Sequence, residues 1–259
     1  RTAMSAIYHE RTLLKLCLCD FIIPNLGRLS RSSLVLLQER RYNVGEVNAM
    51  KLLATGFEPF GGETVNPAWE AVQRLPERIG AWELTKLQVP TVFGSAAECV
   101  LSRAQTLLPD AVVCVGQAGG RRAVTPELVA INLQYASIAD NRGQQPQDVP
   151  CVPGAPSAYF STLPVRHMAE AIRAAGLPGE LSYSAGSFVC NDLLFRLLHR
   201  YDGTQTRVCF IHVPYLPEQA KNGVPSMQLD DMIRALEAAI AVIPAPSAPS
   251  CACGCGGTR

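Results

Sequence analysis

The sequence has almost no net charge and lacks any long hydrophobic run. Its 23 Lys and Arg residues and 22 Asp and Glu residues leave a formal charge of +1, so no overall field attracts nucleic acid or an anionic membrane surface. The most apolar early stretch, residues 13–37, is interrupted by charged residues and a proline. No segment reaches the roughly 18 apolar residues of a membrane-spanning helix. We therefore expect neither a nucleic-acid partner nor a membrane partner.

The sequence also lacks the patterns of disulfide frameworks and nucleotide-binding loops. Its ten cysteines include no CxxC pair, and disulfide frameworks are typical of short secreted chains, so we expect reduced thiols. The motifs GxGxxG, GxxxxGK[ST], HExxH and GxSxG are missing. Gly119-Gly120-Arg121-Arg122 lacks the lysine and hydroxyl of a phosphate-binding loop. These absences exclude the common nucleotide and zinc-peptidase signatures.

Composition divides the chain into three parts. Residues 1–49 have no sustained apolar period, whereas the apolar run at residues 51–55 after Met50 is typical of a buried first strand. Residues 244–259 are rich in Pro, Ser and Gly, a composition that cannot bury a core. We therefore expect a folded domain over residues 50–243. Residues 1–49 are expected to be a non-native or disordered extension, and residues 244–259 a disordered low-complexity tail.

Strand and helix signals alternate within the expected domain. Runs of Val, Ile and Leu predict strands at residues 51–55, 83–89, 111–115, 128–133 and 208–213. Helices are predicted at residues 67–75, 96–108, 164–175, 191–201 and 227–242. Asn66 is expected to cap the first helix, and Ser95 with Glu98 to form a capping box at the second. The alternation predicts a single α/β domain whose twisted, mainly parallel sheet has helices on both faces.

Cys190 has an unusual position among the cysteines. Residues 184–190 lead from an expected short strand into the helix at residues 191–201. The free N–H groups and the dipole at a helix N-terminus favour thiolate, and the same N–H groups can hold the oxyanion of a tetrahedral intermediate. The alternative is an inert, packed thiol.

A nucleophilic thiol needs a base, and His212 is the best placed of four histidines. It ends the strand at residues 208–213, and the carboxyl ends of strands are where open α/β sheets gather functional groups. A satisfied core histidine is the alternative. Glu127 enters a buried strand and needs a partner, either in a structural ion pair or by orienting the imidazole. The other histidines lie in the N-terminal part or on amphipathic helices: His9, His167 and His199.

Six blocks of the expected domain together resemble type I pyroglutamyl peptidases, the pyrrolidone-carboxylate peptidases. They are TGFEPFGGETVNPAWEAV (residues 55–72), VGQAGGRRAVTPELVAIN (115–132), IADNRGQQPQDVP (138–150), YFSTLP (159–164), SAGSFVCN (184–191) and FIHVPYLPEQ (210–219). The resemblance implies a cysteine peptidase whose catalytic triad is Glu127, Cys190 and His212. It also implies an α/β fold, a cytoplasmic location, no metal or other cofactor, and assembly into homo-oligomers, dimers or tetramers.

The implied substrates are peptides with an N-terminal pyroglutamate. This residue is a neutral lactam, so its pocket needs an apolar wall, an acceptor for the ring N–H and a donor for the ring carbonyl. The resemblance places substrate-binding positions at Phe57, Phe60, Gln117, Phe188 and Val189. Packing in the core is the alternative for the aromatic residues.

Two positions depart from the pattern of the family. The residue after the catalytic glutamate is usually basic but is Leu128 here, and Ser137 stands where many members also have a basic residue. A loss of positive charge near the site can raise the thiol pKa or loosen Glu127. Two alternative functions follow: a catalytically impaired homologue that binds peptide N-termini, or a related thiol amidohydrolase.

Overall fold

The computed structural model of the protein describes residues 49–245. The expected extension over residues 1–49 and the expected tail over residues 244–259 lie outside this part, apart from the residues at its two borders. Among the described residues, no helix has the length and apolar content needed to cross a membrane.

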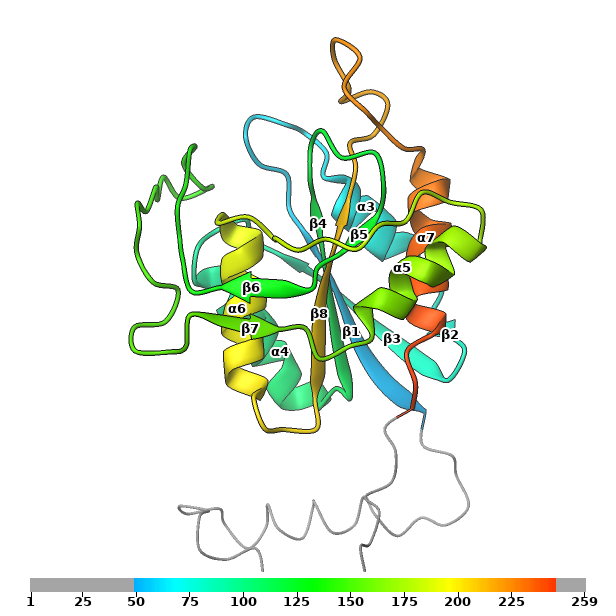
Figure 1. Cartoon of the computed structure of the whole chain (residues 1–259), viewed down its shortest axis with the longest axis horizontal. Helices are drawn as coiled ribbons and strands as arrows, with labels where there is room; N and C mark the ends of the chain where they lie inside the picture. Colours follow the sequence, from blue (N-terminus) through cyan, green and yellow to red (C-terminus); the bar gives the residue numbers. More distant parts are fainter. Residues whose placement is uncertain (1–48, 246–259) are drawn as a thin grey trace, which may run out of the picture. The chain divides into compact units, whose positions relative to one another are not determined.

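A six-stranded sheet forms the centre of the structure (Figure 1). Its four inner strands are parallel, in the order β3 (Trp82–Val89), β1 (Met50–Phe57), β4 (Ala111–Gln117) and β8 (Arg207–Val213). Short antiparallel strands form the two edges: β2 (Arg78–Ile79) and β5 (Thr125–Pro126). β1, β4 and β8 are buried along most of their length, which is characteristic of parallel strands covered on both faces.

Helices cover both faces of this sheet. One face packs against α3 (Pro67–Arg74), α5 (Val165–Ala174) and α7 (Leu229–Ala241). The other face packs against α4 (Ser95–Leu107) and α6 (Val189–Tyr201). Figure 1 shows these two groups on opposite sides of the central strands. The predicted single α/β domain with a mainly parallel sheet is thus confirmed.

The strand predicted at residues 128–133 is shorter and lies outside the main sheet. Only β6 (Val129–Ile131) forms, and it pairs antiparallel with β7 (Ala158–Phe160) in a separate two-stranded sheet. Ala130 is fully buried and Ile131 is exposed, because only one face of this small sheet packs against α6. A continuous apolar run does not distinguish a strand buried on both faces from one buried on a single face.

Two helix starts test the capping predictions. The Asn66 cap is confirmed, because its Oδ1 accepts a hydrogen bond from the Ala68 N–H at 3.1 Å and Pro67 opens the helix. The capping box at Ser95 is wrong. Gly94 is the N-cap of α4, with φ of 72°, and the Gly94 N–H donates to Oδ2 of Asp192 at 2.9 Å. The start of α4 is therefore held by a carboxylate of α6 rather than by a local side chain.

Candidate active site

His212 and Glu127 meet because β5 pairs with β8. Thr125 is the register partner of His212, and the Glu127 N–H donates to the Phe210 carbonyl at 2.8 Å. This pairing places Glu127 beside the imidazole, with 2.7 Å between His212 Nδ1 and Glu127 Oε1. Both side chains are buried. An Nδ1–H that donates to the carboxylate leaves Nε2 free to accept a proton.

Cys190 is the second residue of α6, and its sulphur lies over Gly116 of β4. A Cβ atom on Gly116 would come within 3.0 Å of Cys190 Sγ and within 2.6 Å of Phe210 Cζ. Gly116 is the register partner of His212 in the neighbouring strand, and neighbouring strands lie about 4.8 Å apart. Side chains of register partners point to the same face of a sheet, so the thiol and the imidazole lie side by side on that face. The lack of a side chain at Gly116 makes room for the thiol.

Arg121 is a third partner of this group, and the sequence did not single it out as one. Its Nη1 lies 2.6 Å from Glu127 Oε1, and its Nη2 donates to the Ser184 carbonyl at 3.1 Å. In the sequence, the motif that contains Arg121 resembles only an incomplete phosphate-binding loop. The signal that points to it is the buried carboxylate of Glu127, which calls for a cationic partner.

The pKa shifts of Cys190 and His212 favour an uncharged thiol and an uncharged imidazole near neutral pH. Burial raises the pKa of Cys190 to about 12, and the negative charge of Glu127 raises it too, against the opposing charge of Arg121. Burial lowers the pKa of His212, although the hydrogen bond and charge of Glu127 act in the opposite direction. The helix terminus therefore does not leave a resting thiolate, because burial outweighs it. The thiol must be deprotonated by a base, and the uncharged imidazole can accept that proton.

Glu127 is the ionised member of the group. Burial acts to raise its pKa, but the hydrogen bond and charge of His212, the Ser182 side chain and the charge of Arg121 together outweigh burial and lower it. Oε1 takes both of these partners, whereas Oε2 is buried without a hydrogen-bond partner among residues 49–245. The carboxylate therefore bonds to its cationic and imidazole partners through one oxygen.

Three aromatic rings pack together around Phe188, two residues before Cys190. Phe188 is the N-cap residue of α6, and its ring centroid lies 6.0 Å from that of Phe60 and 5.3 Å from that of Phe93. Phe93 was not among the predicted positions. Asp140 fixes its backbone by accepting the Phe93 N–H at 3.0 Å. This cluster supplies an apolar surface beside the thiol.

Two other predicted substrate-binding positions are buried near the site, and the side chain of a third points away from it. Phe57 is 2% exposed and packs against Phe210 in the core, and Val189 is fully buried at the start of α6. Gln117 follows Gly116, so its side chain points to the opposite face of the sheet. There its Oε1 accepts a hydrogen bond from Gln219 Nε2 at 3.2 Å. Gln117 can therefore face the thiol side only through its backbone.

Asn191 anchors the residue that follows the thiol. It is fully buried; its Oδ1 accepts from the Ile131 N–H at 2.9 Å, and its Nδ2 donates to the carbonyls of Ile131 and Leu133. The start of α6 is thereby fixed against β6. An asparagine next to a cysteine carries no local sign of this role, because its partners come from a distant segment.

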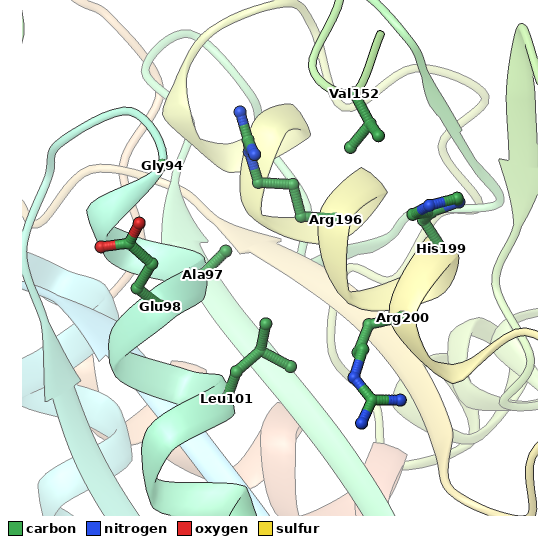
Figure 2. Close-up of a pocket in the computed structure, with 8 residues that line it drawn as sticks. All are labelled: Gly94, Ala97, Glu98, Leu101, Val152, Arg196, His199 and Arg200. Carbon is green, nitrogen blue, oxygen red and sulfur yellow. The ribbon is translucent and has the colours of Figure 1, made fainter. Parts of the chain in front are cut away.

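A pocket between α4 and α6 is lined by different residues (Figure 2). They come from α4, α6 and a loop: Gly94, Ala97, Glu98, Leu101, Val152, Arg196, His199 and Arg200. None of them is a predicted catalytic or substrate-binding residue. Within the described part of the chain, no group of three or more His, Cys, Asp or Glu residues is arranged to hold a metal ion.

Comparison with known proteins relates the chain to one family. The sequence profile described as pyroglutamyl peptidase matches residues 50–245. A pyrrolidone-carboxylate peptidase of Levilactobacillus brevis is 52% identical over 198 residues, covering 75% of this chain and 97% of the relative. A second, of Gloeobacter violaceus, is 48% identical over 198 residues, with 75% and 97% covered.

Solved structures agree with this relationship. Pyroglutamyl peptidase I of Bacillus amyloliquefaciens superposes with a TM-score of 0.73 at 44% identity, covering 75% of this chain and 96% of that one. A mutant pyrrolidone carboxyl peptidase of Pyrococcus furiosus has a TM-score of 0.72 at 39% identity, with 75% and 98% covered. The similarity therefore extends over almost the full length of these proteins.

Proposed function

Because this chain belongs to the pyroglutamyl peptidase family, we propose that Cys190, His212 and Glu127 are its catalytic triad. The protein is a cysteine peptidase that removes N-terminal pyroglutamate from peptides. The observation that supports these three roles is the carboxylate–imidazole hydrogen bond of 2.7 Å beside a thiol that lies over Gly116. A nucleophile, a base and a group that orients the base are thus together on one face of the sheet.

The reaction begins with a proton transfer from the Cys190 thiol to Nε2 of His212. The sulphur forms a bond to the carbonyl carbon of the pyroglutamyl residue, and the free N–H groups at the start of α6 stabilise the oxyanion. The intermediate collapses as the C–N bond breaks, and the imidazolium returns its proton to the leaving amine. A water molecule, deprotonated by His212, then attacks the thioester carbonyl carbon. The C–S bond breaks, pyroglutamate is released, and the imidazolium returns its proton to the Cys190 sulphur. Glu127 holds the imidazole tautomer and stabilises its cation.

The pyroglutamyl ring is proposed to bind against Phe60 and Phe188, which are half-buried. The buried ring of Phe93 supports Phe188 at the start of α6. A charged free amino terminus loses hydration there without compensation, whereas the neutral lactam does not. Backbone groups of Gln117 are left to bond the ring, since its side chain is engaged by Gln219.

The two departures from the family pattern leave the triad intact. Leu128 is half-buried and packs against the core on the side of α3, α5 and α7, and Ser137 is exposed. Arg121 supplies the positive charge that lies beside the Glu127 carboxylate. These contacts favour an active enzyme over an impaired homologue that only binds peptide ends.

The proposed function is tested with fluorogenic amides. We expect the native chain in reducing buffer to release the amine from a pyroglutamyl amide at least about 100-fold faster than from the matched prolyl and glutaminyl amides. The reason is that prolyl and glutaminyl groups carry a charged amino terminus. Prior treatment with iodoacetamide should abolish the release. Comparable cleavage of glutaminyl amide would favour the thiol amidohydrolase, and binding without turnover would favour the impaired homologue.

We further propose that the chain assembles into homo-oligomers through the outer face of β6 and β7. Ile131 and Phe160 are on this face and are 37% and 67% exposed. Large exposed apolar side chains next to one another are typical of interaction surfaces. Light scattering should give a molar mass at least twice 27.9 kDa for the native chain. The same measurement should give a smaller mass for Phe160→Asp, and a monomeric native chain would contradict the proposal.

A cytoplasmic location is also proposed. The five cysteines of the described part are free thiols, and a reaction that depends on a free thiol suits a reducing compartment. Recovery of the activity in a membrane-free cytoplasmic fraction would support this location, and recovery from the medium would contradict it.

A further inference from the structure

Arg121 links the base system to the segment that carries the nucleophile. Its Nη1 bonds to Glu127 Oε1 at 2.6 Å and also contacts Thr125 Oγ1, while its Nη2 bonds to the Ser184 carbonyl at 3.1 Å. Ser184 lies at the start of the stretch that leads into Cys190. The guanidinium of Arg121 therefore bonds both to Glu127, which orients the base, and to the segment that leads into the nucleophile.

The segment before Cys190 has few other anchors to Glu127. Ser182 forms an isolated bridge with Glu127, in which the Leu128 N–H donates to the Ser182 carbonyl at 2.8 Å. Ser182 Oγ and the backbone of Ser184 bond to each other. Arg121 is the charged side chain that continues this set of contacts into the site, and it is only 28% exposed.

Glu127 depends on Arg121 for its orientation. The second carboxylate oxygen, Oε2, is buried and has no hydrogen-bond partner in the described part of the chain. Without the guanidinium, the carboxylate would keep its bond to His212 and the interaction with the Ser182 side chain, but would lose its cationic partner. A buried carboxylate without a cationic partner can rotate or take up a proton.

We propose that Arg121 is a positioning residue of the catalytic site. It holds Glu127 against His212 and ties the Ser184 segment before Cys190 to Glu127. The proposal rests on the triad proposed above. It assigns to Arg121 no contact with the substrate.

The charges around His212 agree with this role. Its pKa is lowered by burial, raised by the hydrogen bond and charge of Glu127, and lowered by Arg121. The thiols of Cys190 and Cys114 lie on the same face of the sheet, and burial raises the pKa of each to about 12, so neither is charged near neutral pH. Removal of the Arg121 cation leaves burial as the one effect here that lowers the pKa of His212, so this pKa is expected to rise.

The test uses three variants of the full chain: Arg121→Met, Arg121→Lys and Arg122→Met. Arg122 is the adjacent residue and is exposed, so Arg122→Met is a matched control that removes the same charge from the same loop. The pH profile of kcat/KM for a pyroglutamyl amide reports the pKa of the base in the free enzyme. Circular dichroism and urea unfolding confirm that each variant is folded.

Arg121→Met is expected to move the acid limb of the profile to higher pH by about one unit. It should also lower kcat by about ten-fold or more, because a misplaced catalytic group reacts slowly. Arg121→Lys should keep the native acid limb, since it keeps the charge, but should lower kcat because ammonium cannot bond Glu127 and Ser184 in the same fork. Arg122→Met should match the native chain in both respects.

An unchanged acid limb in folded Arg121→Met would overturn the proposal. If Arg121→Met does not fold, Arg121→Lys becomes the test of the proposal. A native kcat in Arg121→Lys would then overturn it. If the native chain and Arg122→Met show no turnover, the proposed function itself has failed. The pH dependence of Cys190 alkylation by iodoacetamide, which needs no turnover, then tests Arg121: its charge lowers the thiol pKa, so Arg121→Met should move the alkylation to higher pH.

Discussion

Replacing Cys190 with alanine is expected to lower kcat for a pyroglutamyl amide by about 10⁴-fold or more, because no other group can form the thioester. The fold should persist, since alanine suits the first turn of α6 and leaves the Asn191 contacts in place. The measurement is fluorescent amine release by the native chain and by Cys190→Ala in reducing buffer.

A matched control is Cys99→Ala. Cys99 lies on α4 and is half-buried, and burial raises its thiol pKa as well. This variant should keep native kcat. If Cys190→Ala retained more than a tenth of the native rate, the nucleophile would have to be a different group.

Replacing His212 with glutamine is the second large expected effect. Loss of the base should lower kcat near neutral pH by about 10²–10⁴-fold. Because the thiol pKa of Cys190 is raised to about 12, the thiolate fraction without the base grows about ten-fold per pH unit below that value. We therefore expect the activity of His212→Gln to rise steadily with pH, in contrast to that of the native chain.

His199→Gln serves as the control for this experiment. His199 is exposed on α6 and bonds to the Tyr159 hydroxyl at 2.9 Å, outside the triad. Its replacement should leave both kcat and the pH profile unchanged. Equal losses in the two variants would mean that His212 acts through folding rather than as the base.

Much of the fold could be predicted because its signals are local. β1, β4 and β8 are nearly continuous apolar runs, and such runs are characteristic of parallel strands buried on both faces. Asn66 before Pro67 identified a helix start, since both act within one turn. The position of Cys190 at the start of α6 followed from the same kind of signal.

The parts that could not be predicted depend on partners distant in the sequence. Asp192 took the place of the expected capping box at Ser95, because the Gly94 N–H found a carboxylate from another helix. β6 pairs with β7 in a separate sheet, although its apolar run resembles that of an inner strand of the main sheet. Local propensity predicts neither the cap of α4 by Asp192 nor the pairing of β6 with β7.

The inner strands, the helices and the position of the thiol at a helix start follow from residue patterns in single segments. Apolar periodicity and helix-end residues act over a few positions, so they can be recognised in one sequence. The contacts of the imidazole, and the face of the sheet on which it lies, depend instead on pairing between distant segments. Glu127 reaches His212 across 85 residues through the pairing of β5 with β8, and Arg121 joins them there. Successive side chains of a strand point to opposite faces. Gly116 therefore lies against the thiol, whereas the side chain of Gln117 points to the other face and bonds to Gln219.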